Sequence, residues 1–154
     1  MDHPQKFIKQ KIGFIGGGQM ALALVNGFLT SELISPNQIM ASAPSNKNLK
    51  VWENLSASTT HDNAKVIKNS DVIFLAVKPH IFPEVLKKLK ESLSSENMLT
   101  NESKLFISIM AGIKVETLTT SLKSIVQSPR IIRATVNTPA RVSQGCFVYS
   151  LSKE

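Results

Sequence analysis

Lys11-Ile12-Gly13-Phe14-Ile15-Gly16-Gly17-Gly18-Gln19-Met20-Ala21 is the stretch that decides the fold. Its first five residues predict a short buried strand, which the three glycines end abruptly. The apolar residues that follow, among them Leu24 and Phe28, predict a helix. We expect this helix to stop near Leu33, because Pro36 cannot continue it. The stretch therefore predicts a strand, a tight turn and a helix.

The glycine positions in this turn have the spacing of a dinucleotide-binding loop, Gly16-x-Gly18-x-x-Ala21. Gly16 permits the tight turn, and Gly18 has no Cβ, so a pyrophosphate can approach the backbone closely. Ala21 is small enough for the helix to pack against the strand. The start of the helix offers free N–H groups and the positive end of its dipole to phosphates. A tight turn without a ligand is the alternative, and the flanking strand and helix favour the ligand.

The rest of the chain alternates predicted strands with predicted helices. We predict strands at Ile39–Ser42, Ala57–Thr60, Asp71–Val77, Leu105–Met110, Arg130–Val136 and Cys146–Ser150. We predict helices at Leu49–Leu55, Asn63–Asn69, Pro83–Leu93 and Val115–Leu122, the second of them capped by Asp62. The alternation indicates an α/β fold, a Rossmann-like, doubly wound and mostly parallel sheet in a single domain. That domain covers 11–150, between an N-terminal tail at 1–10 and a C-terminal tail at 151–154.

The composition excludes several classes of function. Cys146 is the only cysteine, so a disulfide framework and a CxxC metal site are absent, and His61 and His80 lack partners at metal-ligand spacing. We therefore expect no metal. The net charge is +7 in 154 residues, but the lysines are scattered and no aromatic-basic interleaving accompanies them. We expect a solvated surface, no nucleic acid and no membrane partner. The polar first residues and the single cysteine predict a cytoplasmic protein.

The turn after the second strand bears on the choice of cofactor. An NAD site is expected to carry an acidic residue there, to grip the ribose 2′-hydroxyl. This chain has Ser42-Ala43-Pro44-Ser45-Asn46-Lys47, without an acid. Hydroxyl, amide and ammonium groups can bind a 2′-phosphate, which a carboxylate would repel. The turn therefore favours NADP(H) and leaves NAD(H) open.

Several stretches in order make the sequence resemble pyrroline-5-carboxylate reductase over nearly its whole length. They are Gly13–Gly16, Gln19–Ala21, Ile39–Ser42, Ser70–His80, Ala111–Ile113 and Asn137–Pro139. The resemblance implies an oxidoreductase of proline biosynthesis, which reduces the ring C=N of 1-pyrroline-5-carboxylate to L-proline with NAD(P)H. The partner is then a small-molecule substrate.

The resemblance also implies a set of cofactor-binding residues. Matched positions put Ile15, Gly16, Gly17, Gly18, Gln19 and Met20 at the pyrophosphate, Ser42 and Asn63 at the adenosine ribose, Ala76, Val77, Lys78 and Pro79 along the nicotinamide half, Ala111 and Gly112 in the next loop, and Asn137 near the nicotinamide. Two departures from the family matter. Ala43 stands where relatives often have a second serine, and Ile109-Met110 replaces smaller residues.

The resemblance covers only the cofactor-binding part. Family members continue with a helical domain that dimerises and completes the substrate pocket, and no counterpart of it follows Tyr149. The catalytic residues are therefore unknown and expected mostly in that domain, and a homo-oligomer is expected only if the domain exists. Activity of this chain alone stays open.

Two alternatives to a pyrroline-5-carboxylate reductase remain. One is a truncated or divergent paralogue that holds NADP(H) without turning over substrate. The other is a different NADP-dependent reductase, of the coenzyme F or 6-phosphogluconate type, which Val77–His80 and Asn137–Pro139 fit less well. The side chain of Lys78 has two interpretations. It binds a phosphate or a carboxylate, or it points to solvent. A proton-transfer role of His80 is the weaker reading of that residue.

Overall fold

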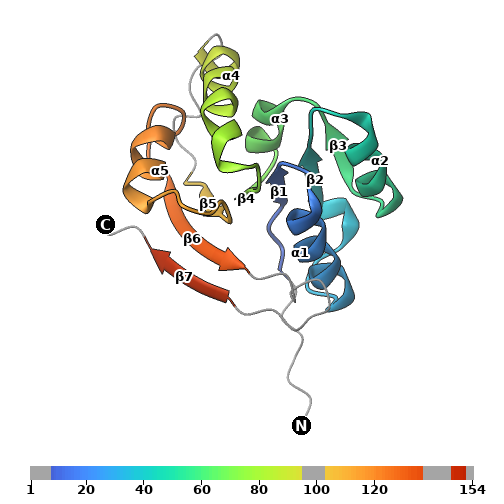
Figure 1. Ribbon diagram of the computed structural model, residues 1–154. Helices are drawn as coiled ribbons and strands as arrows, with labels where there is room; N and C mark the ends of the chain where they lie inside the picture. The colour runs from blue at the N-terminus through green and yellow to red at the C-terminus, as the bar shows by residue number, and fades with distance from the viewer. Residues whose placement is uncertain (1–7, 95–102, 137–146, 152–154) are drawn as a thin grey trace.

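The described residues form one seven-stranded sheet with helices on both sides (Figure 1). The computed structural model describes residues 8–94, 103–136 and 147–151. The strands are β1 (Ile12–Ile15), β2 (Ile39–Ser42), β3 (Ser58–Thr60), β4 (Val72–Leu75), β5 (Leu105–Ser108), β6 (Arg130–Val136) and β7 (Phe147–Leu151). The helices are α1 (Gln19–Thr30), α2 (Asn46–Asn54), α3 (Asn63–Lys68), α4 (Phe82–Ser94) and α5 (Val115–Leu122), with short 3₁₀ turns η1 (Pro36–Gln38) and η2 (Pro79–Ile81).

The strand order is β3-β2-β1-β4-β5-β6-β7, and the first six strands run parallel. Only β7 is antiparallel, to β6. The chain moves outward from β1 in one direction and then returns to continue from β4 in the other. This reversal is the topological switch point of a doubly wound sheet, and it confirms the predicted fold class.

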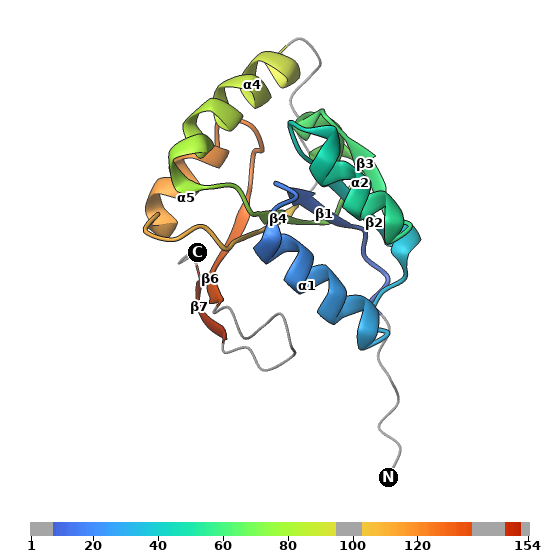
Figure 2. The same ribbon diagram turned by 45° about the vertical axis from the view of Figure 1, so that its right-hand side comes forward.

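Helices lie on both faces of the sheet (Figure 2), and an apolar core packs against each face. Helices α3, α4 and α5 cover one face, where Ile73 and Phe106 are fully buried. Helix α1 covers the other face together with Trp52 of α2, over Phe14 and Phe74. The rings of Phe14 and Phe74 are stacked with their centroids 4.9 Å apart. The alternating side chains of each strand thus divide between two separate cores.

Several predicted boundaries were wrong by a few residues. Helix α1 ends at Thr30 and not near Leu33, because Glu32 takes a left-handed conformation (φ 55°) and Leu33 N bonds back to Phe28 O. Helix α2 begins at Asn46, so Asn46 and Lys47 are helical rather than part of a loop. The predicted strands 71–77 and 105–110 shorten to Val72–Leu75 and Leu105–Ser108, because the chain turns out of the sheet at their carboxyl ends.

Other local predictions were confirmed. Asp62 caps α3 by accepting a hydrogen bond from Ala64 N at 2.8 Å, and α5 spans the predicted residues. Trp52 and Met110 are buried, each in one of the two cores. Cys146 and the turn Asn137–Pro139 lie outside the described residues.

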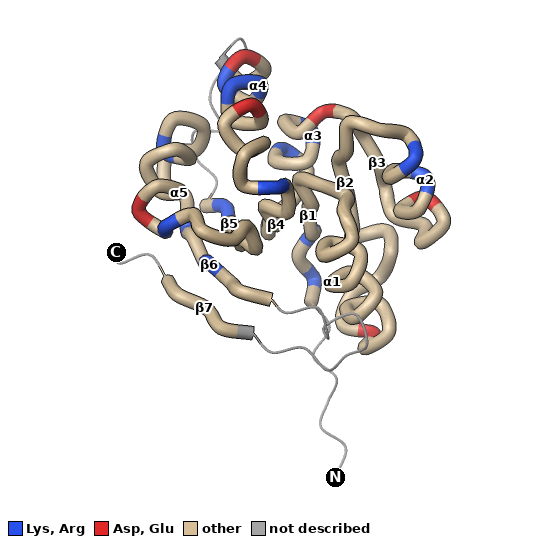
Figure 3. The backbone as a smooth tube through the Cα atoms, in the orientation of Figure 1, with Lys and Arg blue, Asp and Glu red and all other residues tan. Residues whose placement is uncertain are grey.

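Charged residues are distributed unevenly over the described chain (Figure 3). Lysines and arginines are spread over α2, α3, α4, β6 and the residues that flank α5 and several strands, whereas α1 and β7 carry no charged side chain. Among the described residues, no helix combines the length and the apolar character needed to cross a membrane.

Candidate dinucleotide-binding site

The carboxyl ends of β1, β2 and β4 are tied together by backbone hydrogen bonds around the glycine turn. Gly16 N donates to Ser42 O at 3.0 Å, and Ala76 N donates to Ile15 O at 2.9 Å. These bonds place the turn at the switch point between β1 and β4. In open α/β sheets ligands bind in the crevice at this point.

Gly16 is required by its conformation and by its surroundings. Its φ is +103°, a region that L side chains rarely adopt, and a Cβ there would lie 2.7 Å from the backbone of Ala76. Gly18 differs, because its φ is −79° and a Cβ would meet nothing within 4 Å. The open space beside Gly18 is therefore available to a ligand.

Helix α1 begins directly at this open space. Gly18 is its N-cap, no side chain caps the helix, and its first turn contains no acidic residue. The first N–H groups of α1 are left without intrahelical acceptors, and the helix dipole adds positive potential there. Gln19 is exposed and Met20 half-buried at this end, while Ala21 is buried against the sheet. This geometry suits a phosphate group.

Trp52 supports the glycine turn from the side and was missed as a site residue by sequence reasoning. Its indole Nε1 donates to Gly17 O at 3.2 Å, and a Cβ on Gly17 would lie 2.8 Å from that nitrogen. Trp52 itself is fully buried against Phe14. No local signal could have found this contact, because 34 residues separate the two partners in the sequence.

Ser42 and Asn63, both predicted at the adenosine ribose, contact each other. Ser42 Oγ lies 2.6 Å from Asn63 Oδ1 and 3.3 Å from Phe14 O. The shorter distance is typical of an O–H···O hydrogen bond, so the buried Ser42 hydroxyl donates to the Asn63 oxygen. The amide nitrogen of Asn63 is then turned away from Ser42, toward the neighbouring cavity.

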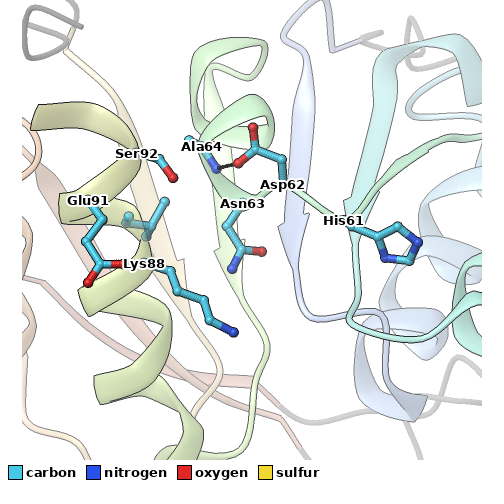
Figure 4. Close-up of a pocket in the computed structure, with 8 residues that line it drawn as sticks. His61, Asp62, Asn63, Ala64, Lys88, Glu91 and Ser92 are labelled. Carbon is cyan, nitrogen blue, oxygen red and sulfur yellow. Dashed lines mark hydrogen bonds between the residues drawn. The ribbon is translucent and has the colours of Figure 1, made fainter. Parts of the chain in front are cut away.

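Two adjoining cavities extend from this pair toward α4. The first, of about 240 Å³, reaches from Gly16 and Ser42 to Ile81 and Val85. The second, of about 190 Å³, lies between α3 and the later turns of α4. Figure 4 shows Asn63 and Lys88 pointing into the second cavity from opposite sides. His61, Asn63 and Lys88 line both cavities, which therefore form one groove.

The predicted nicotinamide-side residues follow β4 and β5 at the same edge of the sheet. Ala76 and Val77 are half-buried, whereas Lys78 and Pro79 are exposed at the start of η2. Lys78 and His80 are exposed and line neither of the two cavities that form the groove. Ala111 and Gly112 (φ +78°) form an exposed turn after β5. Asn137 lies outside the described residues.

A second group of residues at the groove was not predicted from the sequence. His61 directly follows β3, and Glu84 and Lys88 form an ion pair of 2.8 Å on α4. The Lys88 ammonium, by its hydrogen bond and its charge, holds the pKa of Glu84 below its usual value, and Glu84 raises the pKa of Lys88. For His61 the available signal was its place at the carboxyl end of a strand. Among the described residues no group of acidic, histidine or cysteine side chains could hold a metal ion.

The fold and the groove define a dinucleotide-binding domain of the Rossmann class. The chain belongs to the family described as NADP oxidoreductase, coenzyme F420-dependent, whose model matches residues 11–112.

Within this family, the chain is similar to relatives and solved structures of one named enzyme. The chain is 37% identical to pyrroline-5-carboxylate reductase 3 of Danio rerio over 97% of its own length and 48% of the relative's. A pyrroline-5-carboxylate reductase of Coxiella burnetii superposes with a TM-score of 0.79 at 33% identity, covering 95% of this chain and 51% of the other. The NADP-bound enzyme of Plasmodium falciparum gives 0.73 at 30% identity, covering 96% and 50%. The chain thus spans about half the length of the relatives that it matches.

Proposed function

We propose that this chain binds NADP(H) at the groove and forms the cofactor-binding part of a pyrroline-5-carboxylate reductase. The observation that carries the proposal is the uncapped start of α1 at Gly18, with open space where a pyrophosphate would lie. A relative of that name at 37% identity, and an NADP-bound one among the solved structures, support it. A cytoplasmic location and the boundaries 1–10, 11–150 and 151–154 belong to the same proposal.

The geometry of the groove supports the proposed roles at α1 and Asn63, and the resemblance to the family supports the others. The turn from Ile15 to Gly18 and the start of α1 at Gln19 and Met20 hold the pyrophosphate, in the open space beside Gly18. Asn63, oriented by Ser42, donates its amide to the adenosine ribose. Ala76 to Pro79, Ala111, Gly112 and Asn137 border the nicotinamide half. When bound, the dihydronicotinamide supplies the hydride that reduces the C=N bond of the substrate.

The absence of an acidic residue after β2 supports NADP(H) as the favoured cofactor. Ser42 ends β2, and the next residues, Ala43 to Lys47, carry no carboxylate that would repel a 2′-phosphate. NAD(H) remains a weaker ligand in this proposal. Three carboxylates line the groove: Glu84, which is paired with Lys88, Asp62, which caps α3, and Glu91.

Fluorescence of the single tryptophan tests cofactor binding directly. Trp52 is hydrogen-bonded to the glycine turn, so titration with NADPH is expected to change its emission, with calorimetry as a second readout. Absence of binding at millimolar NADPH contradicts the proposal.

A matched pair of variants on α1 localises the binding. Gly18→Ala and Gly27→Ala each add one methyl group where no atom lies within 4 Å. We expect Gly18→Ala to weaken NADPH binding at least roughly tenfold, because the methyl group occupies the space needed by the pyrophosphate. Gly27→Ala should leave the affinity unchanged and stabilise the helix by about 0.5–1 kcal/mol. Equal affinities of the two variants would argue against a pyrophosphate at Gly18.

The second candidate is a divergent relative that holds NADP(H) without catalysis. This candidate requires only the groove at the glycine turn, Ser42 and Asn63, which the described residues contain. Measurement of L-proline formation from 1-pyrroline-5-carboxylate and NADPH separates the two. Turnover by the purified chain alone rules out the second candidate.

A further inference from the structure

His61 connects the turn after β3 to the turn after β2. Its ring Nδ1 lies 2.8 Å from Ala43 O, and its Nε2 lies 2.8 Å from Asn46 Oδ1. Figure 4 shows the ring turned away from Asn63 and Lys88. The ring therefore contacts the acid-free turn on which the choice between the two dinucleotides depends.

The two contacts determine whether each ring nitrogen donates or accepts a hydrogen bond. Ala43 O is a carbonyl and can only accept, so Nδ1 must carry a proton. A neutral imidazole has one donor and one acceptor, so its Nε2 would then need a donor from Asn46. The contact between Nε2 and the Asn46 amide is therefore made either by a protonated ring to the amide oxygen or by a neutral ring to the amide NH₂ group.

The charge of His61 thus determines which end of the Asn46 amide is free. Beside an imidazolium, Asn46 turns its oxygen to the ring and leaves its NH₂ group for a ligand. Beside a neutral ring, the amide rotates, and its oxygen becomes the free end. An NH₂ donor and a nearby positive charge suit a 2′-phosphate, whereas a free oxygen suits the 2′-hydroxyl of NAD.

We propose that His61 is a positioning residue that sets, through Asn46, the preference of the groove for the 2′-phosphorylated dinucleotide. The inference rests on the proposed function, because it places the adenosine ribose at the turn after β2. The charged groups around this turn are Asp62 beside His61, Lys47 beside Asn46, and Glu84, Lys88 and Glu91 on α4. Of the groups named here, only the imidazole belongs to a side-chain type that ordinarily changes charge between pH 5 and 8.

Calorimetry with two adenosine fragments isolates the effect without catalysis. Adenosine 2′,5′-bisphosphate carries the 2′-phosphate, and 5′-AMP carries the hydroxyl. The matched variant is His61→Asn, because its amide can still donate to Ala43 O but cannot be protonated. Titration of the 2′-phosphate itself affects both proteins equally and cancels in their ratio of affinities.

We expect wild type to bind the bisphosphate roughly tenfold more tightly than His61→Asn at about pH 5.5, and less than about twofold more tightly at about pH 8.5. The affinity for 5′-AMP should not follow this pattern. An equal ratio for the bisphosphate at both pH values overturns the inference and leaves the proposed function intact. Wild type that binds neither NADPH nor the bisphosphate overturns the proposed function, and the inference with it.

Asn46→Asp tests the amide itself. Aspartate has nearly the same shape and accepts from the His61 imidazolium, but it has no NH₂ group to present. At the first residue of α2 a carboxylate also suits the helix dipole, so the fold should persist, as circular dichroism can check. We expect the preference for the bisphosphate over 5′-AMP to fall at both pH values. An unchanged preference contradicts a role of the Asn46 amide.

Discussion

The two faces of the sheet differ in how completely helices cover them. On the covered face, α3, α4 and α5 bury side chains from β1 to β6. On the opposite face, which we call the open face, α1 and Trp52 cover β1, β2 and β4, but no described helix lies over β5 to β7. An apolar cavity of about 310 Å³ borders those strands, lined by Ile107, Ile132 and Tyr149 among others. Burial in this fold therefore depends on position along the sheet as well as on residue type.

The cofactor groove lies where both faces are covered. The glycine turn is held by Trp52 from the open face, and the groove beside it is closed by α3 and α4 from the covered face. Apolar layers on both sides therefore hold the turn in place. The open part of the sheet, over β5 to β7, contributes no residue to the groove.

The largest expected contrast between the faces lies within one strand. Phe106 of β5 is fully buried on the covered face, and its neighbour Ile107 is half-buried on the open face. We expect Phe106→Ala to lower the free energy of unfolding by about 3–5 kcal/mol, because it leaves a cavity in a packed core. Ile107→Ala should cost clearly less. Urea unfolding followed by circular dichroism measures both, and equal losses would show that the open face is as tightly packed.

A smaller effect is expected where α2 supports the glycine turn. Trp52→Phe keeps an aromatic ring against Phe14 but removes the hydrogen bond to Gly17 O. We expect a loss of about 1 kcal/mol in the free energy of unfolding. NADPH binding, measured by calorimetry because the fluorescent reporter is gone, should also weaken. Unchanged binding would mean that the turn holds its shape without the indole.

The exposed strand β7 provides a further test of the difference between the two faces. Tyr149 is 69% exposed and borders the apolar cavity of the open face. Tyr149→Ser should change the free energy of unfolding by no more than about 0.5 kcal/mol. Because large exposed apolar patches favour association, the variant should also self-associate less in sedimentation experiments. A large loss of stability would contradict an open face at β7.

The smallest effect is expected from the ion pair on α4. Glu84 and Lys88 are well exposed, with 61% and 66% of their side-chain surface accessible, so Glu84→Gln should shift the thermal midpoint at pH 7 by an amount close to the error of measurement. Lys88 lowers the pKa of Glu84, so any contribution of the pair exists above the unfolded pKa and is lost as pH falls through the folded one. The raised pKa of Lys88 sets the alkaline limit, because its contribution is lost as pH rises through the folded value. Thermal midpoints of both proteins at acidic and neutral pH provide the check.

The strand, the glycine turn and the helix at residues 11–30 could be predicted because their causes are local. A buried strand shows as an apolar run, and a left-handed residue such as Gly16 favours glycine whatever surrounds it. The alternation of strands and helices after residue 30 could be predicted in the same way. The predictions were wrong at the ends of helices and strands, where a single hydrogen bond can set the boundary. The bond from Leu33 N to Phe28 O is an example.

The sequence by itself determined the order of the parallel elements, the position of the glycine turn and the acid-free turn after β2. Tertiary structure alone decided that Trp52 holds Gly17, that His61 meets Asn46, and that the sheet is covered on one face and partly open on the other. The physical reason is distance along the chain. Periodicity and backbone sterics act between neighbouring residues, whereas these contacts join separate segments that meet only when the helices pack against the finished sheet.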